Sequence, residues 1–235
     1  MTTTTRTGRP SSRSTGGQSS RTIALAVGLL LTVIVAAVVA AVVVGSGTDE
    51  TDAAAAASAR IPTEGTVRQV WYAQASARLP LFDSRQPVDA AVGMTAPSIA
   101  ASHFDDTEVS INFADGQPRV VLFLAHWCPH CQAEVSSLVS RFKAEGIRSD
   151  VELVAVSSSV DEGAPNYPPS VWLTREAWPV PVLRDSQSND LATAFGLSGF
   201  PFAAAVNADG EIVARVSGAV PELQWNEFVD LALTS

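Results

Sequence analysis

Apolar residues gather in one long run near the start of the chain. Residues 23–44 are Ile, Val, Leu and Ala, interrupted only by Gly28 and Thr32. As a helix, these 22 residues would extend about 33 Å, and the hydrocarbon core of a bilayer is about 30 Å thick. The pattern therefore predicts a transmembrane helix over residues 22–44.

Polar sequence of low complexity lies on both sides of this run. Residues 1–21 are mainly Thr, Ser, Gly and Arg, so we expect a disordered tail with too little apolar surface to fold. Residues 45–92 are expected to be a linker. Its second part, residues 61–92, has enough apolar positions for one amphipathic helix that ends near Pro80.

From residue 93 onward, short apolar strands alternate with helical periodicity. Residues 119–125 form a strand-length run that is apolar throughout after Arg119, typical of a strand that is buried on both faces. The order of elements predicts an α/β domain over residues 93–235, with a central mixed β-sheet flanked by helices. The predicted strands are Arg119–Ala125, Val151–Ser157, Pro181–Leu183, Phe202–Val206 and Ile212–Val216, and the predicted helices are Pro129–Ala144, Val171–Ala177, Asn189–Phe195 and Pro221–Leu233.

Three local signals support these elements. Asn207–Gly210, between the last two strands, has the composition of a hairpin turn. The helix that starts at Pro129 is expected to end at Gly146. The last helix has a proline in its first turn, and its predicted apolar side is formed by Leu223, Phe228 and Leu231.

Charge is low overall and unevenly distributed. The net charge of −9 with 17% charged residues excludes a highly charged disordered protein and a basic nucleic-acid binder. Positive charge precedes the apolar run and acidic residues follow it, so the positive-inside rule predicts a single-pass cell-membrane protein with a cytoplasmic N-terminus. The residues concerned are Arg6, Arg9, Arg13 and Arg21 before the run, and Asp49, Glu50 and Asp52 after it.

A cleaved signal peptide is the alternative interpretation of the same run. Ala57-Ser58-Ala59 resembles a small-residue cleavage site, although the apolar part of a signal peptide normally covers only about 7–15 residues. Either interpretation places the rest of the chain outside the cytoplasm. Disulfides persist outside the cytoplasm, so the cysteines of this chain could form a stable or a catalytic disulfide there.

The only two cysteines are Cys128 and Cys131, separated by Pro129 and His130. This count excludes a scaffold of several disulfides and a zinc site built on two Cys-x-x-Cys knuckles. The pair lies where the apolar strand ends and a helix begins, and the first turn of a helix can bring two such Cβ atoms to about 3.8 Å. We therefore predict a redox-active pair.

The two sulfurs are expected to have different roles. Cys128 meets the unpaired N–H groups and the positive end of the helix dipole, which favour a thiolate, so we predict that it is the nucleophile. Cys131 lies one turn further in and would resolve the mixed disulfide. His130 would further stabilise the thiolate and make the disulfide a stronger oxidant.

Other interpretations of the pair stay open from the residues alone. It could be a structural disulfide, although closing so short a loop constrains the unfolded chain little. It could bind a metal together with His126 or His130, or be a pair of inert buried thiols. The corresponding alternative function is a non-catalytic binding module or metal carrier.

Three sequence blocks resemble the thioredoxin superfamily, and specifically the membrane-anchored TlpA/ResA-like thiol-disulfide oxidoreductases of bacteria. The blocks are Gly93–Pro97, Val120–Glu134, and Gly199–Pro201 followed by Asn207–Gly210, and the resemblance covers residues 93–235. The Pro-His dipeptide between the cysteines is similar to that of DsbA-type proteins.

The resemblance implies a thioredoxin-like fold and disulfide exchange with other proteins. It implies that Pro201 is cis and faces the disulfide, with the backbone of Phe200 pairing to a substrate strand; an ordinary trans proline is the alternative. The partners would be protein thiols or disulfides, such as apocytochrome c or secreted proteins, and a membrane redox partner. No cofactor and no metal are implied, and whether the chain reduces or oxidises stays open.

Supporting residues each have two interpretations. Glu134 follows Cys131 by three residues on the same helix face and could exchange a proton with it, or be a solvated acid in the first turn. Trp127 is expected to shield one side of the site. His126 could lie near Cys128 or be a strand-end histidine bonded to backbone. The loop over residues 161–169 is expected to be an ordinary connection or, alternatively, to select substrates.

Overall fold

The computed structural model describes residues 67–234 of the chain. The predicted tail over residues 1–21, the apolar span over 22–44 and the first part of the linker lie outside the described residues. Within residues 67–234, none of the helices is long and apolar enough to cross a membrane.

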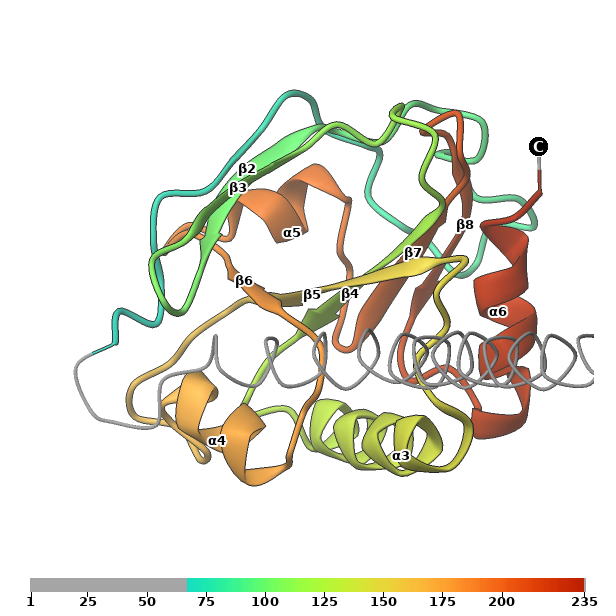
Figure 1. Cartoon of the computed structure of the whole chain (residues 1–235). Helices are drawn as coiled ribbons and strands as arrows, with labels where there is room; N and C mark the ends of the chain where they lie inside the picture. Colours follow the sequence, from blue (N-terminus) through green and yellow to red (C-terminus); the bar gives the residue numbers. More distant parts are fainter. Residues whose placement is uncertain (1–66, 235) are drawn as a thin grey trace, which may run out of the picture. The chain divides into compact units, whose positions relative to one another are not determined.

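A mixed β-sheet forms the centre of this part of the chain (Figure 1). Its order is β1-β2-β6-β5-β4-β7-β8, and β3 also pairs with β2. The central strand β4 (Arg119–Leu124) is buried along its whole length and runs parallel to β5 and antiparallel to β7. The other strands are β1 (Gln74–Ala75), β2 (Ile99–His103), β3 (Glu108–Ile111), β5 (Glu152–Ser157), β6 (Val182–Arg184), β7 (Phe202–Val206) and β8 (Ile212–Ser217).

Helices cover both faces of the sheet, and Figure 1 shows α3 and α4 on one side of the sheet with α5 on the other. The helices are α3 (Pro129–Glu145), α4 (Pro169–Arg175), α5 (Asp190–Ala194) and α6 (Trp225–Leu231), with a short 3-10 turn at Glu222–Gln224 before α6. The predicted α/β architecture is confirmed. All five predicted strands are found with ends shifted by at most one residue, and three of the four helices with ends shifted by at most two.

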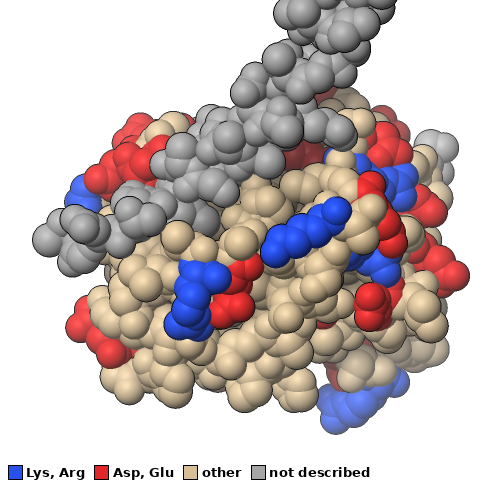
Figure 2. Space-filling view, turned by 60° about the horizontal axis from the view of Figure 1, so that its bottom comes forward, with Lys and Arg blue, Asp and Glu red and all other residues tan. Residues whose placement is uncertain are grey.

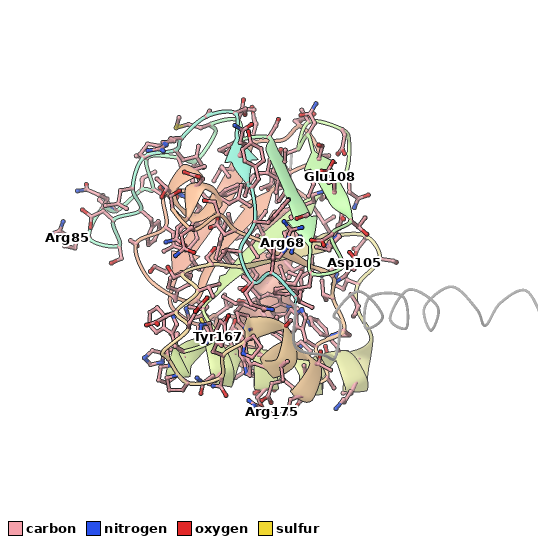
Figure 3. The ribbon with its side chains drawn as sticks, turned by 90° about the vertical axis from the view of Figure 1, so that its left-hand side faces the viewer. Arg68, Arg85, Asp105, Glu108, Tyr167 and Arg175 are labelled. Atoms are coloured by element: carbon pink, nitrogen blue, oxygen red, sulfur yellow. The ribbon has the colours of Figure 1, made fainter. Side chains whose placement is uncertain are left out.

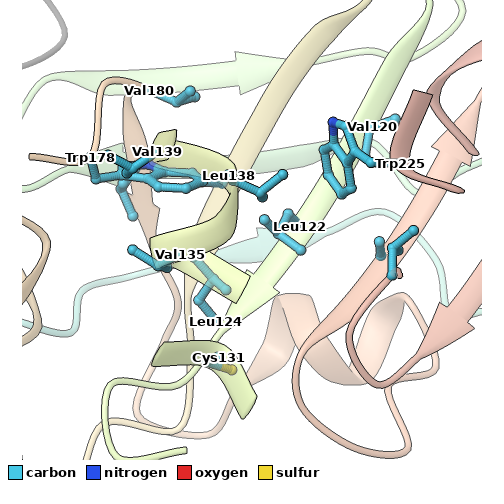
Figure 4. Packing of buried hydrophobic residues seen from close by; sticks show 14 of the residues in the cluster. Val120, Leu122, Leu124, Cys131, Val135, Leu138, Val139, Trp178, Val180 and Trp225 are labelled. Atoms are coloured by element: carbon cyan, nitrogen blue, oxygen red, sulfur yellow. The ribbon is translucent and has the colours of Figure 1, made fainter. Parts of the chain in front are cut away.

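Two hydrophobic clusters form because the side chains of β4 alternate between its faces. Val120, Leu122 and Leu124 point into the cluster under α3, as Figure 4 shows together with Cys131. Cys128 belongs to the same cluster. Val121 and Phe123 point into the cluster on the α5 side. Two packed faces therefore fix the strand end from which the cysteine motif starts.

The last helix starts later than predicted. The chain makes a 3-10 turn after Pro221 and only then enters α6 at Trp225. The later start changes which residues face the core: Leu223 is 92% exposed and Leu231 is 40% exposed, whereas Trp225 and Val229 are buried. Phe228 is buried as predicted, so the expected apolar side was wrong for Leu223 and Leu231.

Residues 67–92 belong to the folded domain and contain no helix, unlike the predicted linker helix. Strand β1 pairs with β2, and the N–H of Leu79 donates to Ala194 O (2.8 Å). Asp89 accepts hydrogen bonds from Arg215, whose side chain is fully buried. At Gly196, with φ +69°, an added Cβ would clash with the carbonyl oxygen of Pro80. The segment is thus fitted closely against α5 and β8.

Candidate active site

The two cysteines lie at the N-terminus of α3, as predicted. Cys128 is the N-cap residue in an extended conformation, and Pro129 occupies the first turn. Cys128 is 6% exposed and Cys131 is fully buried, and both are thiols. The difference in burial makes Cys128 the sulfur that a partner can reach.

Cys131 is held as a buried thiol. The N–H of Ala125, at the end of β4, donates to Cys131 Sγ at 3.4 Å. Burial raises the pKa of the Cys131 thiol and outweighs the contact with Ala125, which lowers it, and the nearby Cys128 raises it further. Cys131 therefore stays protonated until a reaction step removes its proton.

Glu134 is a buried acid on the same helix. Its side chain belongs to the buried face of α3, and the residue is 4% exposed. Burial raises the pKa of Glu134 to about 7, although the N–H of Val220 donates to its Oε1 at 3.4 Å. The charge of Glu134 also raises the pKa of Cys131, so the two groups interact. The alternative of a solvated first-turn acid is wrong.

The loop before β7 closes over the reachable sulfur. The Phe200–Pro201 peptide is cis, as the resemblance implies. The thiol of Cys128 donates to Phe200 O across 3.6 Å. The backbone of Phe200 and the Cys128 sulfur are therefore neighbours.

Trp127 forms the adjoining wall and is 37% exposed. Its Nε1–H donates to Ser159 O at 2.7 Å, and its ring lies edge to face with Phe200 at 6.0 Å between centroids. His130 is exposed in the first turn of α3.

The face that carries α3 and α4 consists mostly of uncharged residues, with charged side chains scattered over it (Figure 2).

His126 connects the motif to the loop that follows β5. Its fully buried ring bonds through Nδ1 to Pro165 O (2.8 Å), and its Nε2 accepts from the N–H of Asp161 (3.2 Å). These contacts require a neutral ring protonated at Nδ1, and burial lowers the pKa of His126. Both ring nitrogens are engaged by backbone groups, so His126 is the strand-end histidine of the second interpretation.

The backbone of His126 holds the same loop. Its carbonyl accepts from Gln132 Nε2 (3.0 Å) and from Asn166 Nδ2 (3.3 Å). From the sequence, the loop is expected to be a connection or, alternatively, to select substrates, because nothing in its composition shows what it contacts. A histidine directly before Trp-Cys was the available signal for this contact.

Comparison with known proteins gives a family match over most of the folded part. A family model described as Redoxin matches residues 91–229. Probable nucleoredoxin 1 of Arabidopsis thaliana is 28% identical over 112 residues, which are 47% of this chain and 19% of that protein. Nucleoredoxin of Bos taurus is 26% identical over 104 residues, 43% of this chain and 23% of that protein. The chain thus matches about a fifth of the length of these curated relatives.

Solved structures with a similar chain trace are also found. A thiol:disulfide interchange protein of the thioredoxin family from Chlorobium tepidum has a TM-score of 0.49 at 24% identity, over 63% of this chain and all of that one. StoA from Bacillus subtilis has a TM-score of 0.46 at 22% identity, over 59% of this chain and 98% of that one.

Proposed function

Because the chain belongs to the Redoxin family, we propose that it is a protein thiol-disulfide oxidoreductase whose reacting pair is Cys128 and Cys131. The observation that carries the proposal is the arrangement of two thiols at the start of α3, one 6% exposed beside Phe200 O and one fully buried behind it. A pair of inert buried thiols would show no such difference in exposure.

The exchange proceeds in two displacements. The Cys128 thiolate attacks one sulfur of a partner disulfide, a mixed disulfide forms, and the other partner sulfur leaves as a thiolate that takes up a proton. Cys131 then loses its proton and attacks Cys128 Sγ, which releases the second partner thiolate. The chain is oxidised by two electrons and the partner is reduced by two. The oxidising direction runs through the same steps in reverse.

Glu134 supplies the base for the second displacement. The Cys131 thiol has a raised pKa and lies away from solvent, so its proton needs an acceptor inside the protein. A carboxyl with a pKa of about 7 is ionised in half of the molecules near neutral pH and can accept this proton. After the disulfide forms, the same group returns the proton to solvent.

The location of the reaction is part of the proposal. The N-terminal apolar span would anchor the chain in the cell membrane, with the N-terminus in the cytoplasm and the catalytic domain outside. The catalyst is made of protein groups, so no cofactor or metal is needed. Its partners would be extracytoplasmic proteins with thiols or disulfides, apocytochrome c and secreted proteins among them, and a membrane protein that resets the cysteine pair.

Insulin reduction separates this function from a binding module or metal carrier. We expect the chain to accelerate reduction of insulin by dithiothreitol, and the Cys128→Ser variant to give the uncatalysed rate. Equal rates for both proteins would remove the enzymatic proposal.

The orientation in the membrane gives a separate prediction. In a background without Cys128 and Cys131, Ala77→Cys should react with an impermeant maleimide on intact cells, and Ser12→Cys should react only after lysis. Ala77 is an exposed position of the folded domain, so its label reports the side of the membrane on which that domain lies. Reversed labelling would contradict the extracytoplasmic location.

His130 is expected to set part of the redox potential. A charge-assisted contact to the Cys128 thiolate, worth about 1.5–3 kcal/mol, corresponds to roughly 30–65 mV for a two-electron couple. His130→Pro should therefore make the couple more reducing by that amount, measured by equilibration with glutathione. His130→Arg keeps a hydrogen-bond donor at this position and should not become more reducing than the parent. If the redox potential of the His130→Pro variant equals that of the parent, His130 does not stabilise the Cys128 thiolate.

A further inference from the structure

We propose that a groove beside the active site binds a positively charged segment of the protein substrate, an inference that rests on the proposed function. The side groove, as we name it, lies between residues 67–71 on one side and residues 160–162 with Tyr167 and Gln187 on the other. Its volume is about 570 Å³. Figure 3 looks onto this side of the molecule, with Arg68 above Tyr167.

The side groove starts directly behind the wall of the active site. Val160 lines it, and the preceding residue, Ser159, accepts the hydrogen bond from the Trp127 indole. Tyr167 lines it as well, with its ring at 6.1 Å from the ring of His126. An extended chain advances about 3.3 Å per residue, so a substrate bound at Cys128 can reach the groove within a few residues of its own cysteine.

The wall formed by residues 160–167 is fixed before a substrate arrives. The contacts of His126 with the N–H of Asp161 and with Pro165 O hold it at two points, and Asn166 bonds to the His126 carbonyl. A wall that is already ordered loses little conformational entropy when a ligand binds. The same histidine directly precedes Trp127. His126 therefore holds the groove wall and the cysteine motif in a fixed position relative to each other.

The charge available in the groove is negative. Asp161 and Glu162 are exposed, and within residues 67–234 neither side chain takes part in an ion pair. The cation of the groove is already engaged: Arg68 lies over the Trp71 ring, with 3.2 Å from its guanidinium carbon to the ring centre, and pairs with Asp106. The whole chain has a net charge of −9, so its field also favours a cationic ligand.

These groups match a lysine or arginine side chain of an extended polypeptide. The cationic end would lie between Asp161 and Glu162, and the aliphatic part would pack on Tyr167. Burial and the nearby charge of Glu162 raise the pKa of the Tyr167 phenol, so this carboxylate lies close to the ring at the groove. The class of substrate inferred is a protein with Lys or Arg a few residues from its reacting cysteine.

The test compares two variants with the same change of charge. Asp161→Asn with Glu162→Gln removes both acidic charges of the groove. As the control, Glu222→Gln with Glu227→Gln removes two exposed acidic charges, one in the 3-10 turn before α6 and one in its first turn. The rate at which each full-length protein reduces two peptide disulfides of equal length is measured. One peptide has three lysines beside its cysteine, and the other has three glutamates there. Both flanks of the cysteine are tested.

We expect the parent and the control to reduce the lysine peptide about tenfold faster in kcat/KM on at least one flank at low salt, with the preference falling as salt rises. The groove variant should keep less than about a twofold preference. A preference that is absent from the parent, or retained by the groove variant, would overturn the proposal.

A binding measurement decides the question without relying on catalysis. The Cys128→Ser chain, with and without the groove substitutions, is titrated with a labelled lysine peptide whose cysteine is serine. Weaker binding of the peptide by the groove variant supports the proposal that the side groove binds a cationic segment, and equal binding overturns it. The proposed function is judged separately by the reaction of the parent and Cys128→Ser with the neutral bis(2-hydroxyethyl) disulfide.

Discussion

The Cys131→Ser chain is expected to accumulate mixed disulfides with its protein partners, and the Cys128→Ser chain is expected to accumulate almost none. Cys128 is the sulfur beside Phe200 O that a partner can approach, whereas Cys131 is fully buried under the end of β4. Without Cys131 the first displacement still occurs, but nothing inside the protein releases the bound partner. Turnover should fall at least about a thousandfold in both variants because both sulfurs are needed for a cycle.

Non-reducing gels of acid-quenched cells, followed by mass spectrometry of the trapped species, give the measurement. The double variant without either cysteine is the control for chance disulfides. Equal trapping by the two single variants would mean that the attacking sulfur has been misassigned.

Replacing Glu134 with Gln should change both the pH dependence of stability and the rate of resolution. The pKa of Glu134 is raised from 4.5 to about 7 in the folded chain. The folded state therefore binds the proton more tightly, and stability falls as pH rises through this window. The whole effect is at most about 3.4 kcal/mol, and Glu134→Gln should lose this pH dependence, so the variant gains stability relative to the parent between pH 4 and pH 8.

Urea unfolding of the reduced proteins at several pH values measures this difference. Glu227→Gln, an exposed acid on α6, is the matched control and should follow the parent. In stopped-flow experiments, Glu134→Gln should resolve a preformed mixed disulfide about a hundredfold more slowly, without the inflection near pH 7. Parallel stability curves for parent and variant, with unchanged resolution, would show that Glu134 neither binds a proton in this range nor moves one.

The sequence was sufficient for those parts of the fold that depend on local pattern. Strand β4 is a run of large apolar residues, and α3 has a proline at its start, so both were predictable from the residues themselves. The cysteine pair was located for the same reason, because the strand end and the helix start bracket it. The conformation of Pro201 followed only from the resemblance.

Elements that depend on tertiary contacts were missed. Strand β2, Ile99–His103, consists mainly of small residues without a clear alternation, and it is a strand because it pairs on both edges with β1, β3 and β6. The segment 67–92 was assigned to a linker because its buried residues are far apart in sequence. Its contacts with Arg215 and Ala194 come from the other end of the chain.

The role of His126 was equally hidden in the sequence. The sequence places a histidine before Trp127 and Cys128, and its ring can form hydrogen bonds. Its two backbone partners, however, lie 35 and 39 residues further along the chain. For Glu134 the helical spacing gave the correct face, and the structure added that this face is buried.

The most direct test of the exchange reaction is a redox titration of the full-length chain. The protein is equilibrated with glutathione buffers, acid-quenched, alkylated and weighed by mass spectrometry. We predict one two-electron transition between free thiols and an intramolecular Cys128–Cys131 disulfide, at a potential between about −270 and −120 mV. A chain that stays fully reduced across this range, or that forms only adducts with glutathione, would contradict it.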